Sequence, residues 1–214
     1  MGSWQSDFTQ WVSAWAAVRG LSSTQDGDAV KMAPSRGLDP PQYVVTWPGR
    51  DTPRAAAEVA GRRGARLTMV TDDAETAQSF AARQDLAPLS RLALLSAYPS
   101  DLPQAPQLPE DADLTMTLTE SCSVVEISSF GDVVALGRMA PVRGFAVFGG
   151  LDIRRADPDH TMESAVLAAL AGEAAARDAP MILMPALPKS ALWYRRQGWS
   201  PTADVLTFMR AADA

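Results

Sequence analysis

The stretch SALWYRRQGW, residues 190–199, together with the segments on either side of it, decides the fold. It lies in Pro188–Gln197, which predicts a short helix that ends at Gly198, because glycine readily adopts the left-handed conformation found just after helices. Before it, Met181–Met184 predicts a short buried strand, and Met162–Arg177 predicts a long helix with apolar residues on one face. The end of the chain therefore alternates helix and strand.

Further strands flank these elements. Runs of β-branched and aromatic residues predict four strands before the long helix and one after the short helix: Leu114–Leu118, Ser123–Ser129, Val133–Ala140, Gly144–Arg154 and Asp204–Met209. The resulting order, β-β-β-β-α-β-α-β, predicts an α/β fold, in the sense of an α+β mixed sheet with helices packed on it.

Residues 1–97 predict a second α/β unit. A helix is indicated by apolar residues at a spacing of three to four, Phe8, Trp11, Trp15 and Val18. The other elements expected here are strands at Ala29–Met32, Gln42–Trp47, Arg66–Thr71 and Arg91–Ala97, a helix at Pro53–Ala65, and a helix capped by Asp72 or Asp73. Residues 98–112, YPSDLPQAPQLPEDA, are rich in proline and acids, which predicts a linker between units 1–97 and 113–214.

Composition narrows the class of protein. The 214 residues are 47% hydrophobic with a net charge of −6, which is typical of a globular protein and argues against a nucleic-acid partner. No run is apolar enough for a membrane span or a secretory signal, and a single cysteine favours a reducing, cytoplasmic location. The one histidine, His160, argues against a zinc site and is expected to be an exposed turn residue. The sequence leaves the oligomeric state open, a homo-oligomer included.

Residues 112–210 resemble the GNAT superfamily of N-acetyltransferases. Three pieces carry the resemblance: the predicted hairpin Ser123–Ala140, the strand end Leu151–Pro158, and residues 190–199, which are similar to the family's late A-x-x-L-Y-x-x-x-G-F/W motif with Ser190 and Trp193 as departures. The resemblance implies a GNAT-like fold with a diverged N-terminal α/β half, which could be a degenerate copy of the same fold.

The resemblance also implies site residues. Tyr194 matches the tyrosine that protonates the departing thiolate, and Asp152 lies where family members carry an acidic base. Glu126 alternates with Val125 and Ile127 in its strand and is a second, weaker candidate for the base. Tyr194 could instead be a packed aromatic residue, and Asp152 a surface acid paired with Arg154. Gly149 and Gly150 predict a bulge that lets the backbone approach the pantetheine arm of acetyl-CoA, or a plain relief of strand twist.

The predicted coenzyme loop departs from the family. Family members carry R/Q-x-x-G-x-G/A, whose backbone amides bind the pyrophosphate, whereas residues 157–166 read DPDHTMESAV and contain no glycine or arginine. Thr161 is the expected helix N-cap, and the amides of residues 161–164 are the predicted phosphate contacts: Thr161, Met162, Glu163 and Ser164. The Glu163 charge opposes phosphate binding there.

Two functions follow from the resemblance. The first is an N-acetyltransferase that moves an acetyl group from acetyl-CoA to a small-molecule amine or an amino terminus by direct attack. The second is a GNAT-fold protein whose degenerate pyrophosphate loop no longer binds the coenzyme, acting as a non-catalytic binding or assembly module. The glycine-free loop favours the second, and Tyr194 and Asp152 favour the first. Whether the protein is an enzyme is left open by the sequence.

Overall fold

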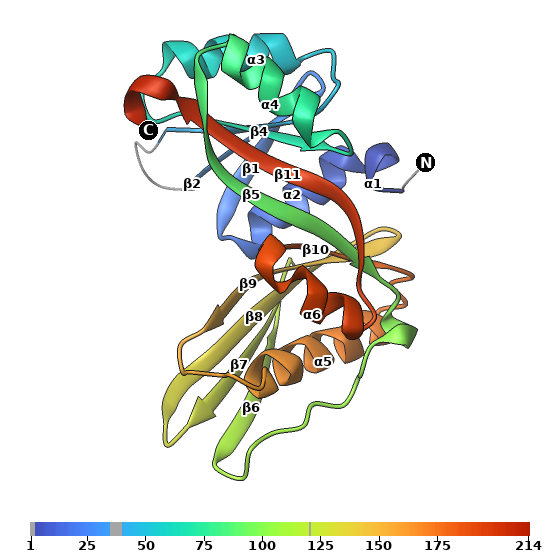
Figure 1. Ribbon diagram of the computed structural model, residues 1–214. Helices are drawn as coiled ribbons and strands as arrows, with labels where there is room; N and C mark the ends of the chain where they lie inside the picture. Colours follow the sequence, from blue (N-terminus) through green and yellow to red (C-terminus); the bar gives the residue numbers. More distant parts are fainter. Residues whose placement is uncertain (1–2, 35–39, 120) are drawn as a thin grey trace.

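A mixed β-sheet runs the length of the molecule (Figure 1). The computed structural model describes residues 3–34, 40–119 and 121–214, and in these ranges eleven strands form one sheet, in the order β1-β2-β3-β4-β11-β5-β10-β9-β8-β7-β6. The strands are β1 Leu21–Asp26, β2 Ala29–Pro34, β3 Gln42–Thr46, β4 Arg66–Thr71, β5 Leu86–Ala97, β6 Ala112–Leu118, β7 Ser123–Ser129, β8 Asp132–Val142, β9 Phe145–Ile153, β10 Ile182–Ala186 and β11 Ser200–Arg210.

Helices cover both faces of this sheet. They are α1 Ser3–Ser6, α2 Phe8–Val18, α3 Thr52–Gly61, α4 Ala74–Arg83, α5 Thr161–Ala176 and α6 Ala191–Arg196, with 3-10 turns η1 Pro99–Asp101, η2 Pro188–Ser190 and η3 Ala211–Asp213. The predicted cap of α4 is confirmed at Asp73, whose carboxylate accepts a hydrogen bond from the Thr76 amide. In the part of the chain that is described, no helix is long and apolar enough to cross a membrane.

The two halves of the chain exchange their last strands. The same order of elements occurs twice, as β3-α3-β4-α4-β5 and as β9-α5-β10-α6-β11, and in each unit the first two strands are parallel. β11 pairs with β4 of the first unit, β5 pairs with β10 of the second, and β5 and β11 pair with each other along the middle of the molecule (Figure 1). A degenerate copy of one fold would give this repetition.

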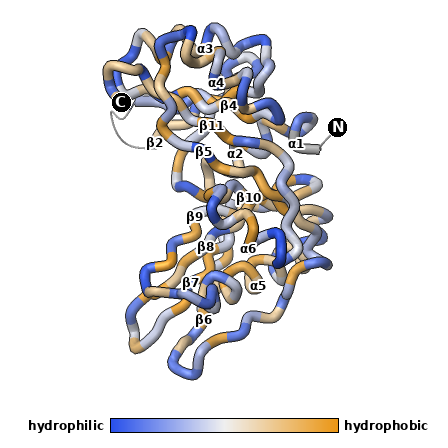
Figure 2. The backbone as a smooth tube through the Cα atoms, in the orientation of Figure 1, coloured by the Kyte–Doolittle hydropathy of each residue, from blue (hydrophilic) through white to orange (hydrophobic). Residues whose placement is uncertain are grey.

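Three hydrophobic clusters hold the layers together. One lies under α5 and α6, one under α3 and α4, and the third lies between α2 and the opposite face of the sheet. Successive side chains of β5 point to opposite faces of the sheet. Leu95 belongs to the cluster under α5, whereas Leu94 belongs to the cluster under α2. Figure 2 shows hydrophobic segments running along the strands in the middle of the molecule.

The predicted mixed sheet and its order of elements in the second half are confirmed, with differences at the edges. β1 was not predicted, because Leu21–Asp26 is a polar strand whose side chains are mostly exposed. The stretch 98–112 contains η1, and Leu102 within it is buried against α5. The division into two domains stays a prediction, and the sheet itself continues across it.

Candidate active site

A cleft opens where β9 and β10 separate. The two parallel strands pair at Ala146–Ile182 and Val147–Leu183, and beyond these positions they diverge. The ladder between β8 and β9 shifts register at the same level, since Leu136 faces Asp152 but Arg138 faces Gly149. The predicted bulge is therefore confirmed, and it turns the end of β9 away from β10.

The glycines of the bulge are required by close packing against α2. A Cβ on Gly149 would lie 2.7 Å from Cγ2 of Val18, and one on Gly150 would lie 2.9 Å from the Val18 carbonyl oxygen. Gly150 also has a φ of 59°, which favours glycine. Both residues line the cleft, where the sequence predicted contact with the coenzyme.

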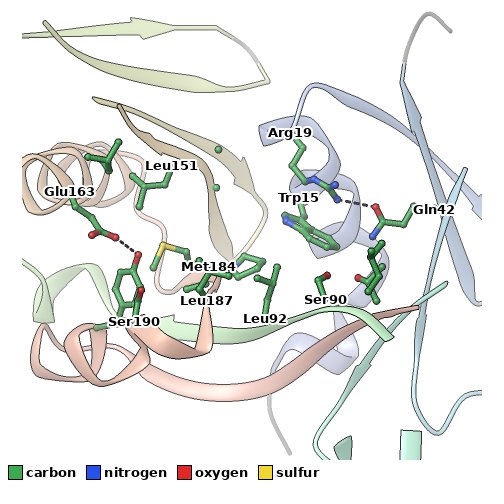
Figure 3. A pocket seen from close by; sticks show the side chains of 18 of the residues that line it. Trp15, Arg19, Gln42, Ser90, Leu92, Leu151, Glu163, Met184, Leu187 and Ser190 are labelled. Atoms are coloured by element: carbon green, nitrogen blue, oxygen red, sulfur yellow. Dashed lines mark hydrogen bonds between the residues drawn. The ribbon is translucent and has the colours of Figure 1, made fainter. Parts of the chain in front are cut away.

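The cleft encloses about 440 Å³. It begins on the face of the sheet that α2 covers and passes between β9 and β10 towards α5 and α6, where Glu163 and Tyr194 line it. Figure 3 shows Arg19 at one end and Glu163 at the other, with Leu92, Met184 and Leu187 between them. A cavity of this size and mixed lining is typical of a small-molecule site.

Tyr194 is held rigidly at the α6 end of the cleft. The residue is buried, its ring packs edge-on against Trp193 and Trp199, and its hydroxyl donates a hydrogen bond to Oε1 of Glu163. Burial, reinforced by the Glu163 carboxylate, raises the pKa of Tyr194 above its ordinary value. The hydroxyl therefore stays protonated at neutral pH.

His160 is a part of this site that sequence reasoning missed. The exposed turn residue expected there is wrong, because the imidazole is half-buried and stacks on Trp193 with ring centroids 4.3 Å apart. Its Nδ1 lies 2.7 Å from Oε2 of Glu163. Glu163 thus contacts both His160 and Tyr194. Because Tyr194 belongs to a different helix, α6, the spacing of these residues along the sequence does not predict that they meet.

The N-terminus of α5 is partly occupied by groups of the chain itself, one carboxylate and one carbonyl. The predicted N-cap, Thr161, is the first helical residue instead, and His160 precedes it with a φ of 55°. The Glu163 amide donates to Oδ2 of Asp157 at 3.0 Å, and the Ser164 amide donates to the His160 carbonyl at 2.8 Å. The side chain of Met162 is buried in the core.

The remaining amides of this turn are those of Thr161 and Met162. In the ranges the structure describes, no hydrogen-bond acceptor pairs with either of them. Of the four predicted phosphate contacts, these are the two whose amides have no acceptor among the described residues, although neither residue lines the cleft and Met162 is buried.

Asp152 and Glu126 lie apart from Tyr194. Asp152 is exposed and forms an ion pair with Arg154 at 2.8 Å, and it does not line the cleft. Glu126 is in β7, two strands away from β9, and does not line the cleft either. The role of either as a base stays a prediction. The carboxylate that does line the cleft with Tyr194 is that of Glu163.

The end of the cleft under α2 is basic and was not predicted. Arg19 follows α2, and its guanidinium lies over the Trp15 ring, 4.8 Å from the ring centre. Nη1 of Arg19 donates to Oε1 of Gln42 at 3.1 Å, and Arg66 lines the same end from β4. Trp15 and Arg19 are one helical turn apart, and this spacing could have predicted that they contact each other. No pattern in the neighbouring sequence predicts that Gln42 and Arg66 lie beside them.

Comparison with known proteins identifies the class of fold. No family model matches the sequence, and no curated protein matches it. Among solved structures, a GCN5-related N-acetyltransferase from Kribbella flavida is similar over 96% of this chain and 94% of its own, with a TM-score of 0.65 and 16% identity.

Two further structures share the architecture. A GCN5-related N-acetyltransferase from Sphaerobacter thermophilus matches with a TM-score of 0.57 and 12% identity, over 85% of this chain and 76% of its own. A tandem GNAT protein from the clavulanic acid biosynthesis pathway matches with a TM-score of 0.56 and 13% identity, over 84% of this chain and 77% of its own. The chain therefore has a diverged GNAT N-acetyltransferase fold, as its second half predicted.

Proposed function

We propose that the protein is an N-acyltransferase that moves an acetyl group from acetyl-CoA to a small-molecule amine. The observation that carries the proposal is the pair formed by the Tyr194 hydroxyl and the Glu163 carboxylate, which line the cleft beside the separated strands β9 and β10. A protonated hydroxyl and a carboxylate in one cleft supply the acid and the base that acyl transfer to an amine requires.

The cleft fits the two parts of the coenzyme unequally. Its apolar side chains and the backbone of the Gly149–Gly150 bulge suit a narrow pantetheine arm. Thr161 and Met162 do not line the cleft, so the pyrophosphate would be held outside it, by their amides at the α5 N-terminus and close to the Asp157 carboxylate. Acetyl-CoA would supply the activated acyl group as a thioester.

The reaction requires the protein to accept one proton and to donate another. As the C–N bond forms and the C–S bond breaks, one proton leaves the amine nitrogen and one joins the departing sulfur. Tyr194 donates the second of these. Because Asp152 is exposed and paired with Arg154, we place Glu163 ahead of it as the acceptor of the first. The hydrogen bond between Glu163 and Tyr194 passes the proton back, which restores both groups.

Acetyl-CoA is expected to stabilise the protein against heat. At 100 times the dissociation constant, binding adds about 2.7 kcal/mol to the free energy of unfolding, which raises Tm by about 5–10 °C for a chain of this length. Thermal unfolding with acetyl-CoA and with free CoA measures this, and thiol release with a panel of amines measures the transfer. Absence of a shift at millimolar ligand would favour a non-catalytic module instead.

Removing the Asp157 charge is expected to tighten coenzyme binding. Asp157→Asn takes a negative charge from the first turn of α5, where phosphates would bind, so the affinity for CoA should rise about three- to tenfold. The free energy of unfolding should fall by up to about 1 kcal/mol, because the helix loses a charged cap. Asp159→Asn is the matched control, since Asp159 is an exposed acid of the same turn. Equal affinities in both variants would place the phosphates elsewhere.

A further inference from the structure

Two arginines at one end of the cleft have no acidic partner. Arg19 and Arg66 both line the cleft under α2, and within residues 3–34, 40–119 and 121–214 neither forms an ion pair with a carboxylate. The Arg19 guanidinium uses one donor on Gln42, and the remaining donors of both groups are open.

A buried polar ladder holds this end in place. Oε1 of Gln42 accepts the hydrogen bond from Arg19, while Nε2 of Gln42 donates to Oγ1 of Thr68 at 2.6 Å. The Thr68 and Thr207 hydroxyls are joined at 2.9 Å, and all three of these ladder side chains are buried. Arg19 is therefore oriented from two sides, by the Trp15 ring beneath it and by Gln42 beside it.

The electrostatics of this end favour an anion. Burial against the protein, together with the charge of Arg66, lowers the pKa of Arg19 from its ordinary value. Among the described residues that line the cleft, the one acid is Glu163, which lies at the opposite end and is bonded to Tyr194 and His160. An anion between the two guanidinium groups would relieve their repulsion and use their open donors.

The spacing of the two ends indicates the length of the ligand. Arg66 is on β4, and β11 and β5 lie between it and β10, where the acyl group would lie near Met184 and Tyr194. Three strand spacings amount to about 14 Å, of which an arginine side chain spans about half. The side chains between the ends are mainly apolar, with Leu92, Met184 and Leu187 visible in Figure 3.

From this juxtaposition we infer that Arg19 and Arg66 form a carboxylate subsite for the acceptor, and that the acceptor is an amine whose carboxylate is separated from the reacting nitrogen by several bonds of apolar chain. This inference rests on the proposed function only for the amine end of the ligand, since the anion subsite exists whether or not transfer occurs. An α-amino acid is too short to reach both ends.

The test compares amines that differ in their anionic group or in the length of their chain. Acetyl transfer to 6-aminohexanoate, hexylamine, glycine and 6-aminohexylphosphonate is followed by thiol release, and binding of 6-aminohexanoate to the protein without acetyl-CoA is measured by calorimetry. We expect kcat/KM for 6-aminohexanoate to exceed that for hexylamine and for glycine at least about tenfold. Arg66→Gln and Arg19→Gln should each reduce the ratio of 6-aminohexanoate to hexylamine by about 10- to 100-fold, the range for a lost charged hydrogen bond.

Arg83→Gln is the matched control, because Arg83 is an exposed arginine of α4 outside the cleft, and this variant should keep the parent ratio. A ratio near one in the parent, or a ratio that neither cleft variant changes, overturns the carboxylate subsite while leaving the transferase intact. A preference for the phosphonate over the carboxylate of more than about tenfold overturns the choice of anion. If no amine is acetylated but calorimetric binding of 6-aminohexanoate weakens at least about tenfold in Arg66→Gln, the transferase fails and the subsite stands. Absence of binding together with absence of transfer overturns both.

Discussion

Tyr194→Phe is expected to lower kcat/KM for acetyl transfer by about 10²-fold or more, the range for loss of a positioned proton donor. The substitution removes the hydroxyl that faces the cleft and leaves the ring, so its packing against Trp193 and Trp199 is retained. The effect should fall on kcat with little change in KM for the amine, because the lost interaction acts on the departing sulfur and not on the amine. Steady-state thiol release measures both constants.

Tyr98→Phe is the control for this variant, because Tyr98 is 60% exposed and lies outside the cleft. It should behave as the parent. A Tyr194→Phe protein as active as the parent would remove Tyr194 from the mechanism and leave it the role of a packed aromatic residue.

The same substitution also changes the dependence of stability on pH. The folded protein holds the pKa of Tyr194 above its ordinary value, so the unfolded chain loses this proton first as the pH rises above about 10. The parent should therefore lose stability above about pH 10 through this group, whereas the phenylalanine variant should lack this contribution. At neutral pH the variant is expected to be about 1–2 kcal/mol less stable, because Glu163 loses a donor in a largely buried position. Urea unfolding at pH 7 and pH 10.5 measures both differences.

Gly137→Ala is expected to destabilise the fold by about 2 kcal/mol or more, the upper part of the range for overpacking a core. Gly137 is buried in β8 opposite the bulge, and a Cβ there would lie 2.4 Å from Cγ1 of Val166 and 3.2 Å from Cδ1 of Leu170. α5 would have to move away from the sheet, and Glu163 would move with it. We therefore expect Tm to fall by about 4–8 °C and acetyl transfer to weaken in the same variant.

A second substitution tests whether overpacking causes the loss of stability in Gly137→Ala. Val166→Ala removes the methyl group that the new Cβ meets, so Gly137→Ala with Val166→Ala should be more stable than the sum of the two single changes by about 1 kcal/mol or more. Gly61→Ala is the matched control, since Gly61 ends α3 and a Cβ there meets nothing within 4 Å. Additive effects of the two core changes would show that α5 is not pressed against Gly137.

Local signals in the sequence were sufficient for the second half of the fold. β-branched runs, the apolar face of residues 162–177 and the glycine at position 198 led to the observed order of strands and helices. The double glycine at 149 and 150 indicated either a bulge or a relief of strand twist, and the structure has the bulge. Tyr194 was found through its place in a short motif, and it does line the cleft.

The remaining features depend on contacts between distant segments. The pairing of β11 with β4 joins residues about 140 positions apart, as at Met209 and Arg66, and no periodicity within either segment specifies it. The contact of His160 with Glu163 depends on a left-handed turn at position 160, which neither neighbour requires. Arg19 and Arg66 come from separate elements of the first half, so a pattern search along the chain does not bring them together.

The exchange of terminal strands has a consequence for how the chain is made. As it emerges from the ribosome, the segment up to residue 97 cannot complete its own layer, because the strand that pairs with β4 is synthesised much later, at residues 200–210. β4 and β5 therefore remain without their partner strand, β11, while more than a hundred further residues are translated. Native structure in the early half is consequently a late event, and a nascent chain stalled before residue 200 presents an open sheet edge to chaperones and to other nascent chains.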